Sequence, residues 1–214
     1  MSIMATSTQN SQTFRYAAGI IAAAIMAFSC TGEGFTPDET ALIRSADSLM
    51  RVLTIEDSLD LKVLRAQSRD LPASALMSDD YEKLCRLMTA TVTHPSQDGV
   101  GIAGPQVGLN RRVVAVQRFD KEGFPFEVYP NIRIVWASDS LACGPEGCLS
   151  VPGMRGDVMR STEIVIEYTD MEQLKGRRDR CPMPVIRDTV KGFTAVIFQH
   201  ETDHLDGILY TDRL

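Results

Sequence analysis

The stretch QHETDHLDG at residues 199–207 contains an H-E-x-x-H motif. Residues four apart lie above one another on one face of a helix, so His200 and His204 can bind the same metal ion. Glu201 lies between them and can reach a water on that ion. Apolar residues recur at helical spacing before the motif, and Gly207 follows where glycine commonly ends a helix. We therefore predict a helix that carries two metal ligands on its inward face.

A catalytic metal site needs a third protein ligand and an open coordination position. The remaining histidine, His94, lies in a polar stretch typical of a loop. The stretch EGCLSVPG at 146–153 instead offers the thiol of Cys148. A third stretch, GVGIAGPQVG at 99–108, has more glycine than an ordinary core strand and would let the backbone approach a ligand closely.

The three stretches together resemble the peptide deformylases, metal hydrolases that remove the formyl group from N-terminal formyl-methionine. The family patterns G-Φ-G-Φ-A-A-x-Q, E-G-C-L-S and Q-H-E-x-D-H-L-x-G stand here, in the same order, as GVGIAGPQ, EGCLS and QHETDHLDG. The resemblance covers about residues 51–214 and includes DLKVLR at 60–65, which is similar to the family's D-P-x-L-R. It implies an α+β fold with mixed antiparallel strands around a central H-E-x-x-H helix. Strands mixed with helices along the sequence favour the same class.

The resemblance also implies how a metal is used. Cys148, His200 and His204 would hold one divalent ion, with Fe²⁺ favoured by the family and Zn²⁺ or Ni²⁺ suited to the same ligand types. Metal-bound hydroxide would attack the formyl carbon, and Glu201 would act as general base and then as general acid. The Gln106 side chain and the Leu149 backbone N–H would stabilise the oxyanion.

The resemblance also implies which residues bind the substrate and which orient the motif helix. The backbone of Gly99, Val100 and Gly101 would bind the substrate peptide as an added strand. An apolar pocket for the methionine side chain would be formed by Val100, Phe193, Val196 and Ile197, although a plain core position is nearly as good an interpretation of the last two. Asp203 is expected to pair with Arg160 and to fix the orientation of the motif helix.

A residue and a connection depart from the family pattern. Gly104 replaces the second alanine of the first motif, and we expect it to loosen that loop. The hairpin-like connection at 171–190 is about ten residues longer than usual and carries a charged tip.

Local sequence patterns predict several helices and strands of the scaffold. A capping box at Thr36 predicts a helix to about Met50, and Ser78 opens a second helix. Alternation of apolar and polar residues predicts strands near 112–118, 131–137 and 161–170. We divide the chain into a leader (1–35), a helix with a linker (36–59) and a catalytic domain (60–214).

The leader differs in composition from the rest. Its apolar run YAAGIIAAAIMAF at 16–28 has the length of a signal-peptide core, and Ser29-Cys30 resembles a lipoprotein cleavage and lipidation site. We expect a location in the cell envelope with a membrane anchor at Cys30. The alternatives are a cytoplasmic protein with a retained leader, or a start codon placed too far upstream of Met50.

Composition limits the partners. A net charge of −6 and the lack of a basic, aromatic-rich patch argue against nucleic acid. Five widely spaced cysteines do not indicate a disulfide framework. We expect a monomer that acts on formyl-methionyl peptides or nascent chains. The alternatives are an exported homologue that binds formylated peptides with weak or no turnover, and a hydrolase of other amides. Glu201 and Gln106 argue against the first alternative, and the thiol ligand argues against the second.

Overall fold

A computed structural model describes residues 34–178 and 180–214. The predictions for the leader, including lipidation of Cys30, therefore lie outside the described residues. In the two described ranges, no helix is both long enough and apolar enough to cross a bilayer.

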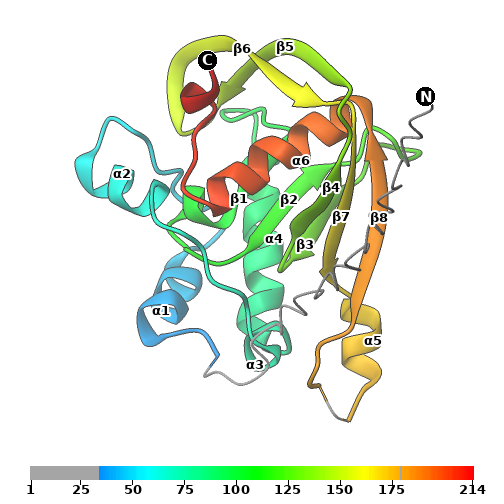
Figure 1. The fold of residues 1–214 in the computed structure, drawn as a ribbon. Coiled ribbons are helices and arrows are strands. Elements are labelled where there is room, and N and C mark those ends of the chain that lie inside the picture. The colour runs from blue at the N-terminus through cyan, green and yellow to red at the C-terminus, as the bar shows by residue number, and fades with distance from the viewer. Residues whose placement is uncertain (1–33, 179) are drawn as a thin grey trace, which may run out of the picture.

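The N-terminal part of the described chain is helical (Figure 1). The predicted capping box is present at Thr36, whose hydroxyl accepts a hydrogen bond from the Glu39 N–H (3.2 Å) while the Glu39 carboxylate accepts one from the Thr36 N–H (2.8 Å). The first helix ends several residues before Met50, because Ala46 already has an extended backbone. Four helices occur in this part: α1 (Pro37–Ser45), α2 (Ser58–Leu64), α3 (Ala73–Leu76) and α4 (Asp79–Thr93).

The strands form three antiparallel sheets. The first sheet contains β1 (Gly101–Ala103), β2 (Val113–Gln117) and β3 (Phe126–Pro130) in that order. The second contains β4 (Arg133–Ala137), β7 (Glu163–Thr169) and β8 (Val185–Lys191), and the third is the hairpin of β5 (Leu141–Cys148) and β6 (Val151–Ser161). The predicted α+β class is thus confirmed.

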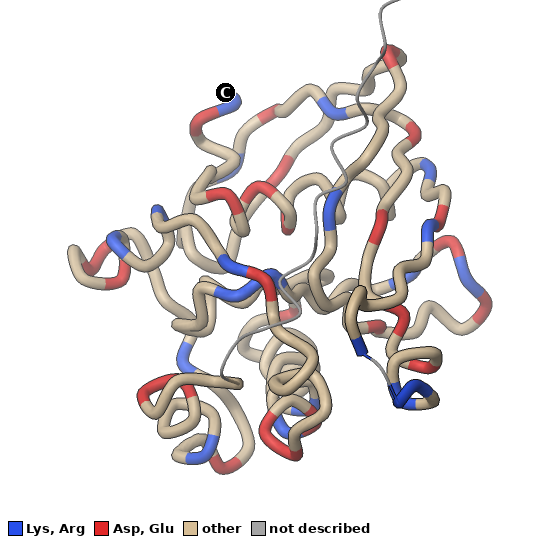
Figure 2. The backbone as a smooth tube through the Cα atoms, turned by 60° about the horizontal axis from the view of Figure 1, so that its bottom comes forward, with Lys and Arg blue, Asp and Glu red and all other residues tan. Residues whose placement is uncertain are grey.

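The lengthened connection contains more structure than the sequence predicted. It begins with a short helix, α5 (Met171–Gly176), which Asp170 caps through its side chain. The chain then returns as β8, which pairs with β7 along its whole length. Acidic and basic residues are interspersed over the face of the molecule that Figure 2 presents.

The motif helix, α6 (Gly192–Leu205), lies against all three sheets (Figure 1). Its apolar side chains pack in one cluster with inward residues of the first two sheets, including Val114, Ile164 and Ile166. Gly207 has φ of +73°, and the Gly207 and Ile208 N–H groups donate to the carbonyls of His204 and Asp203. This is a Schellman ending, so the predicted glycine stop is confirmed.

A second apolar cluster lies on the other side of β1–β3, where α1, α3 and α4 cover the sheet. The first sheet is therefore buried on both faces. Two short 3₁₀ helices complete the fold: η1 (Gly104–Val107), which follows β1, and η2 (Tyr210–Arg213), which ends the chain.

Candidate active site

Three candidate metal ligands meet between α6 and the β5–β6 hairpin. Their ligand atoms, from Cys148, His200 and His204, lie within 4.8 Å of one another, and Cys148 Sγ is 3.2 Å from His204 Nε2. Next to them Glu201 is only 3% exposed, and its Oε2 atom has no hydrogen-bond partner among the described residues. Burying a carboxylate oxygen without a hydrogen-bond partner lowers the stability of the folded protein. One thiol and two imidazoles suit Zn²⁺ or Fe²⁺, and a water on such an ion would supply the missing partner.

The thiol is positioned by a break in the hairpin. The pairing of β5 with β6 shifts register between Gly147 and Cys148, and directly after this shift the Cys148 sulfur lies beside His204 of α6. Two donors point at the sulfur: the Ser150 N–H at 3.4 Å and Gln106 Nε2 at 3.5 Å. These two contacts fix the position of the sulfur beside the two histidines.

Glu146 orients the first histidine. Its Oε2 lies 2.8 Å from His200 Nδ1, and Arg160 donates to both of its oxygens at 2.7 and 3.0 Å. Burial raises the pKa of Glu146, but Arg160 and His200 outweigh it and hold that pKa at about 2. An ionised Glu146 leaves the Nε2 atom of His200 free to face the site. The sequence alone did not lead us to assign a role to Glu146, although it is the first residue of the E-G-C-L-S motif.

The predicted pair of Asp203 and Arg160 is brought together at 2.5 Å. Arg213, from η2, also donates two hydrogen bonds of 2.5 Å each to the Asp203 carboxylate. A continuous series of ion pairs thus runs from Arg213 through Asp203, Arg160 and Glu146 to His200. Nothing in the sequence around Arg213 distinguished it from the other arginines.

We expect Arg213→Ala to weaken metal binding about tenfold, because partners that orient a ligand carry effects of this size. Competition with a chromophoric chelator measures the affinity. Arg187→Ala is the matched control, since it removes an arginine–carboxylate pair on the surface of β7 and β8. Unchanged affinity in Arg213→Ala would show that Glu146 and Arg160 orient His200 without Arg213.

The carboxylate of Glu201 lies against β1. Burial raises the pKa of Glu201 to about 7, even though the nearby His200 lowers it. A Cβ atom built on Gly101 would stand 2.5 Å from Glu201 Oε1. The glycine at this position is therefore what makes room for Glu201.

Gln106 is held rigidly in η1. Its Oε1 accepts a hydrogen bond from the Ala103 N–H at 2.8 Å, which turns the amide nitrogen toward Cys148 and toward Ser150 Oγ at 3.3 Å. Its side chain is buried at the cavity wall, so it can present an N–H donor without a charge.

The expectation that Gly104 loosens this loop was wrong. A Cβ atom there would lie 2.6 Å from the Arg111 carbonyl oxygen and 2.7 Å from that of Leu109. The loop at 109–111 turns inward and occupies the space that an alanine methyl would need. Backbone atoms therefore fill the space that the methyl group would occupy, and the loop is closely packed.

Gly104→Ala is accordingly expected to lower the free energy of unfolding by about 1–3 kcal/mol, the usual cost of overpacking. Chemical denaturation measures the change. Gly144→Ala is the control, because a Cβ atom at Gly144 in β5 meets nothing within 4 Å among the described residues. An increase in stability for Gly104→Ala would contradict the packing argument.

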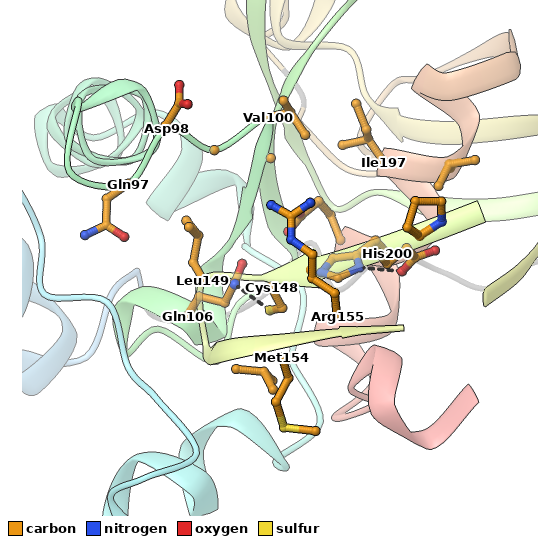
Figure 3. Close-up of a pocket in the computed structure, with 18 of the residues that line it drawn as sticks. Gln97, Asp98, Val100, Gln106, Cys148, Leu149, Met154, Arg155, Ile197 and His200 are labelled. Atoms are coloured by element: carbon orange, nitrogen blue, oxygen red, sulfur yellow. Dashed lines mark hydrogen bonds and ion pairs between the residues drawn. The ribbon is translucent and has the colours of Figure 1, made fainter. Parts of the chain in front are cut away.

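Two of the candidate ligands, Cys148 and His200, line a cavity of about 810 Å³ (Figure 3). Figure 3 shows Gln106, Cys148 and His200 converging, with Val100 and Ile197 on one side and Met154 on the other. The predicted oxyanion donor Leu149 lines it, and so do all the predicted substrate-binding residues: Gly99, Val100, Gly101, Phe193, Val196 and Ile197.

The pocket residues differ in exposure. Ile197 is almost fully buried and belongs both to the cavity wall and to the α6 core cluster. Phe193 is 57% exposed at the rim, where its ring packs 5.3 Å from that of Phe119. An apolar side chain entering the cavity would thus meet a fixed wall at Ile197 and an open rim at Phe193.

One edge of β1 faces the cavity and pairs with no other strand among the described residues. β1 is the outer strand of its sheet, and the Gln117 N–H donates to the Val100 carbonyl at 2.9 Å. Because successive residues of a strand turn their backbone groups to opposite edges, Gly101 directs its N–H and C=O away from β2. A peptide can pair with them.

This fold and site define a hydrolase of the H-E-x-x-H type with a thiol beside its two histidines. The polypeptide deformylase family matches residues 50–214. The peptide deformylase of Leptospira biflexa is 36% identical over 159 residues, which cover 71% of this chain and 82% of that protein. The chain belongs to the polypeptide deformylase family. Its members are metal-dependent enzymes that remove the formyl group from nascent peptides.

Solved structures agree with this assignment. The class I type b peptide deformylase of Acinetobacter baumannii, crystallised with Met-Ala-Ser, is 30% identical, has a TM-score of 0.64 and aligns over 78% of this chain and 98% of its own. The enzyme of Thermotoga maritima is 27% identical with a TM-score of 0.64, over 78% of this chain and 99% of its own.

Proposed function

We propose that the chain hydrolyses the formyl group of formyl-methionyl peptides at a centre where Cys148, His200 and His204 hold one Fe²⁺ ion. The observation that carries this proposal is the buried Glu201 carboxylate beside the three ligand atoms, with its Oε2 unpartnered within the described residues. When bound, the metal would activate a water and polarise the formyl oxygen.

The residues around it would complete the reaction. Glu201 takes a proton from the attacking water and passes it to the leaving amine nitrogen. The Gln106 amide and the Leu149 backbone N–H donate to the developing oxyanion, and one such donor is worth about 3 kcal/mol. A site that only bound formyl-peptides would have no use for Glu201 as a proton carrier, so turnover is favoured over binding alone.

The substrate would lie along β1. Its backbone pairs with the outward N–H and C=O groups of Gly101, whereas the Val100 carbonyl is bonded to Gln117 and the Gly99 N–H to Val92. Its methionine side chain enters between Val100, Phe193, Val196 and Ile197. The Met-Ala-Ser peptide bound by the Acinetobacter baumannii enzyme supports a peptide ligand of this kind.

Turnover of formyl-Met-Ala-Ser by anaerobically Fe²⁺-loaded protein tests the reaction. Substitution with Co²⁺ tests the ligands independently, because a cobalt–thiolate bond gives a charge-transfer absorption band. We expect Cys148→Ser to lose this band and Cys143→Ser, which changes an exposed cysteine of the same strand, to keep it. A band that persists in Cys148→Ser would remove this residue from the ligand set.

We also propose a location in the cell envelope, with a lipid anchor at Cys30. The apolar run at 16–28 and the Ser29-Cys30 pair support it. Labelling of cells with a radioactive fatty acid and fractionation test this location, and protein found solely in the cytosol would overturn it.

A further inference from the structure

Helix α1 precedes residue 50, where the family match begins, yet it is part of the folded core. Ile43 is fully buried in the cluster that covers the first sheet. Arg44 forms two hydrogen bonds of 2.8 and 2.9 Å to Asp80 at the start of α4, and Lys83 Nζ donates to the Arg44 carbonyl. Helix α1 is thus fixed against α4 through both apolar and polar contacts.

A buried ion pair connects α1 to a loop beside the active site. Arg111 donates to Glu39 through Nε (2.7 Å) and Nη2 (2.9 Å), and its Nη1 donates to the Asp70 carbonyl at 3.0 Å. The side chains of Arg111 and Glu39 are only 7% and 14% exposed. A guanidinium buried to this degree needs its carboxylate, because an unpaired buried charge is strongly destabilising. The position of Arg111 therefore depends on α1.

The backbone of Arg111 in turn braces η1. Its carbonyl oxygen occupies the space beside Gly104, and the neighbouring Leu109 N–H donates to the Gly104 carbonyl at 2.9 Å. At the other end of η1, Leu42 of α1 packs against Gly108, with its Cδ2 atom 3.3 Å from where a Cβ would stand. Helix α1 thus contacts one flank of the four-residue helix that carries Gln106 directly, through Leu42, and the other flank indirectly, through Arg111.

The chain after α1 reaches the same residues. The Leu53 N–H donates to the Gln106 carbonyl at 2.8 Å, and the Ile55 N–H donates to the Ser150 carbonyl at 2.9 Å. Ser150 is the residue whose hydroxyl lies near Gln106 Nε2. The segment from α1 to Ile55 therefore supports Gln106 through its backbone, its flanking loop and its side-chain neighbour.

We propose that α1 is a positioning element for the oxyanion donor, acting through the Glu39–Arg111 pair and Leu42 on the loop that carries Gln106. This inference rests on the proposed role of Gln106 in formyl hydrolysis. A donor must sit within a fraction of an ångström of the oxyanion position, so a small displacement of η1 lowers kcat without removing metal or substrate contacts.

The test uses Glu39→Gln and Leu42→Ala in the full chain, assayed well below their melting temperatures. We expect each variant to lower kcat per bound metal about fivefold to tenfold, with metal content unchanged and KM within about twofold of the parent protein. Arg44→Gln is the matched control, because it breaks an ion pair of α1 that contacts α4 and not the loop. We expect it to leave kcat unchanged.

A double-mutant cycle with Gln106→Ala separates positioning from general loss of stability. If α1 acts through Gln106, Glu39→Gln should lower kcat less than about twofold in the Gln106→Ala background. An equal loss in both backgrounds, or an equal loss in Arg44→Gln, would overturn the proposal. If Gln106→Ala itself leaves kcat unchanged, the oxyanion role and the positioning role both fail, while formyl hydrolysis by the remaining site still stands.

Discussion

Glu201→Gln is expected to lower kcat by about 10²- to 10⁴-fold while the protein stays folded and binds metal. Glutamine has the shape of glutamate but cannot take a proton from water or deliver one to the leaving amine. The side chain is buried at the cavity wall, so bulk water cannot replace it as the proton carrier. The metal ligands are separate side chains and are not altered by the change.

Single-turnover assays with formyl-Met-Ala-Ser, normalised to bound metal, measure this effect. Glu163→Gln is the control, since it makes the same chemical change on β7, where Glu163 pairs with Lys191 at the surface. Should Glu201→Gln keep more than about a tenth of the parent rate per metal ion, proton transfer would have to be assigned to another group.

The H-E-x-x-H helix could be predicted from sequence because its signals are local. Its apolar spacing runs through α6, and its glycine stop follows directly at Gly207. The hairpin that delivers Cys148 could not be predicted in this way. Its strand β5 contains two glycines and a proline, which normally mark a break. The hairpin packs against α6 and η2, which follow much later in the chain.

The residues around the metal ligands show the same limit. The pair of Asp203 and Arg160 was expected from the family resemblance, but Glu146 and Arg213 were not assigned. The role of Glu146 depends on its contact with His200, which lies 54 positions later in the chain. The role of Arg213 depends on the contact that η2 allows it to make with Asp203. The error at Gly104 has the same origin, because the carbonyl groups that fill its space come from a loop that no local pattern describes.

Gly101→Ala is expected to lower kcat about 10²-fold, although it adds only one methyl group. That methyl would lie 2.5 Å from Glu201 Oε1 and 2.9 Å from two carbons of the same side chain. β1 is fixed by its pairing with β2, where Gly101 stands opposite Val116, so the carboxylate has to move. A displaced Glu201 can no longer reach the attacking water in the geometry that proton transfer needs.

The three atoms nearest to the new methyl group all belong to Glu201 and not to a ligand residue, so metal content should remain at the parent level while kcat falls. Gly147→Ala is the matched control, because this glycine lines the same cavity and a Cβ atom there makes only ordinary contacts, starting at 3.6 Å with Arg155. A Gly101→Ala enzyme within about threefold of the parent kcat would mean that β1 yields and Glu201 keeps its place. Because Gly101 also offers its backbone to the substrate, KM separates the two roles: loss of proton transfer lowers kcat, whereas loss of strand pairing raises KM.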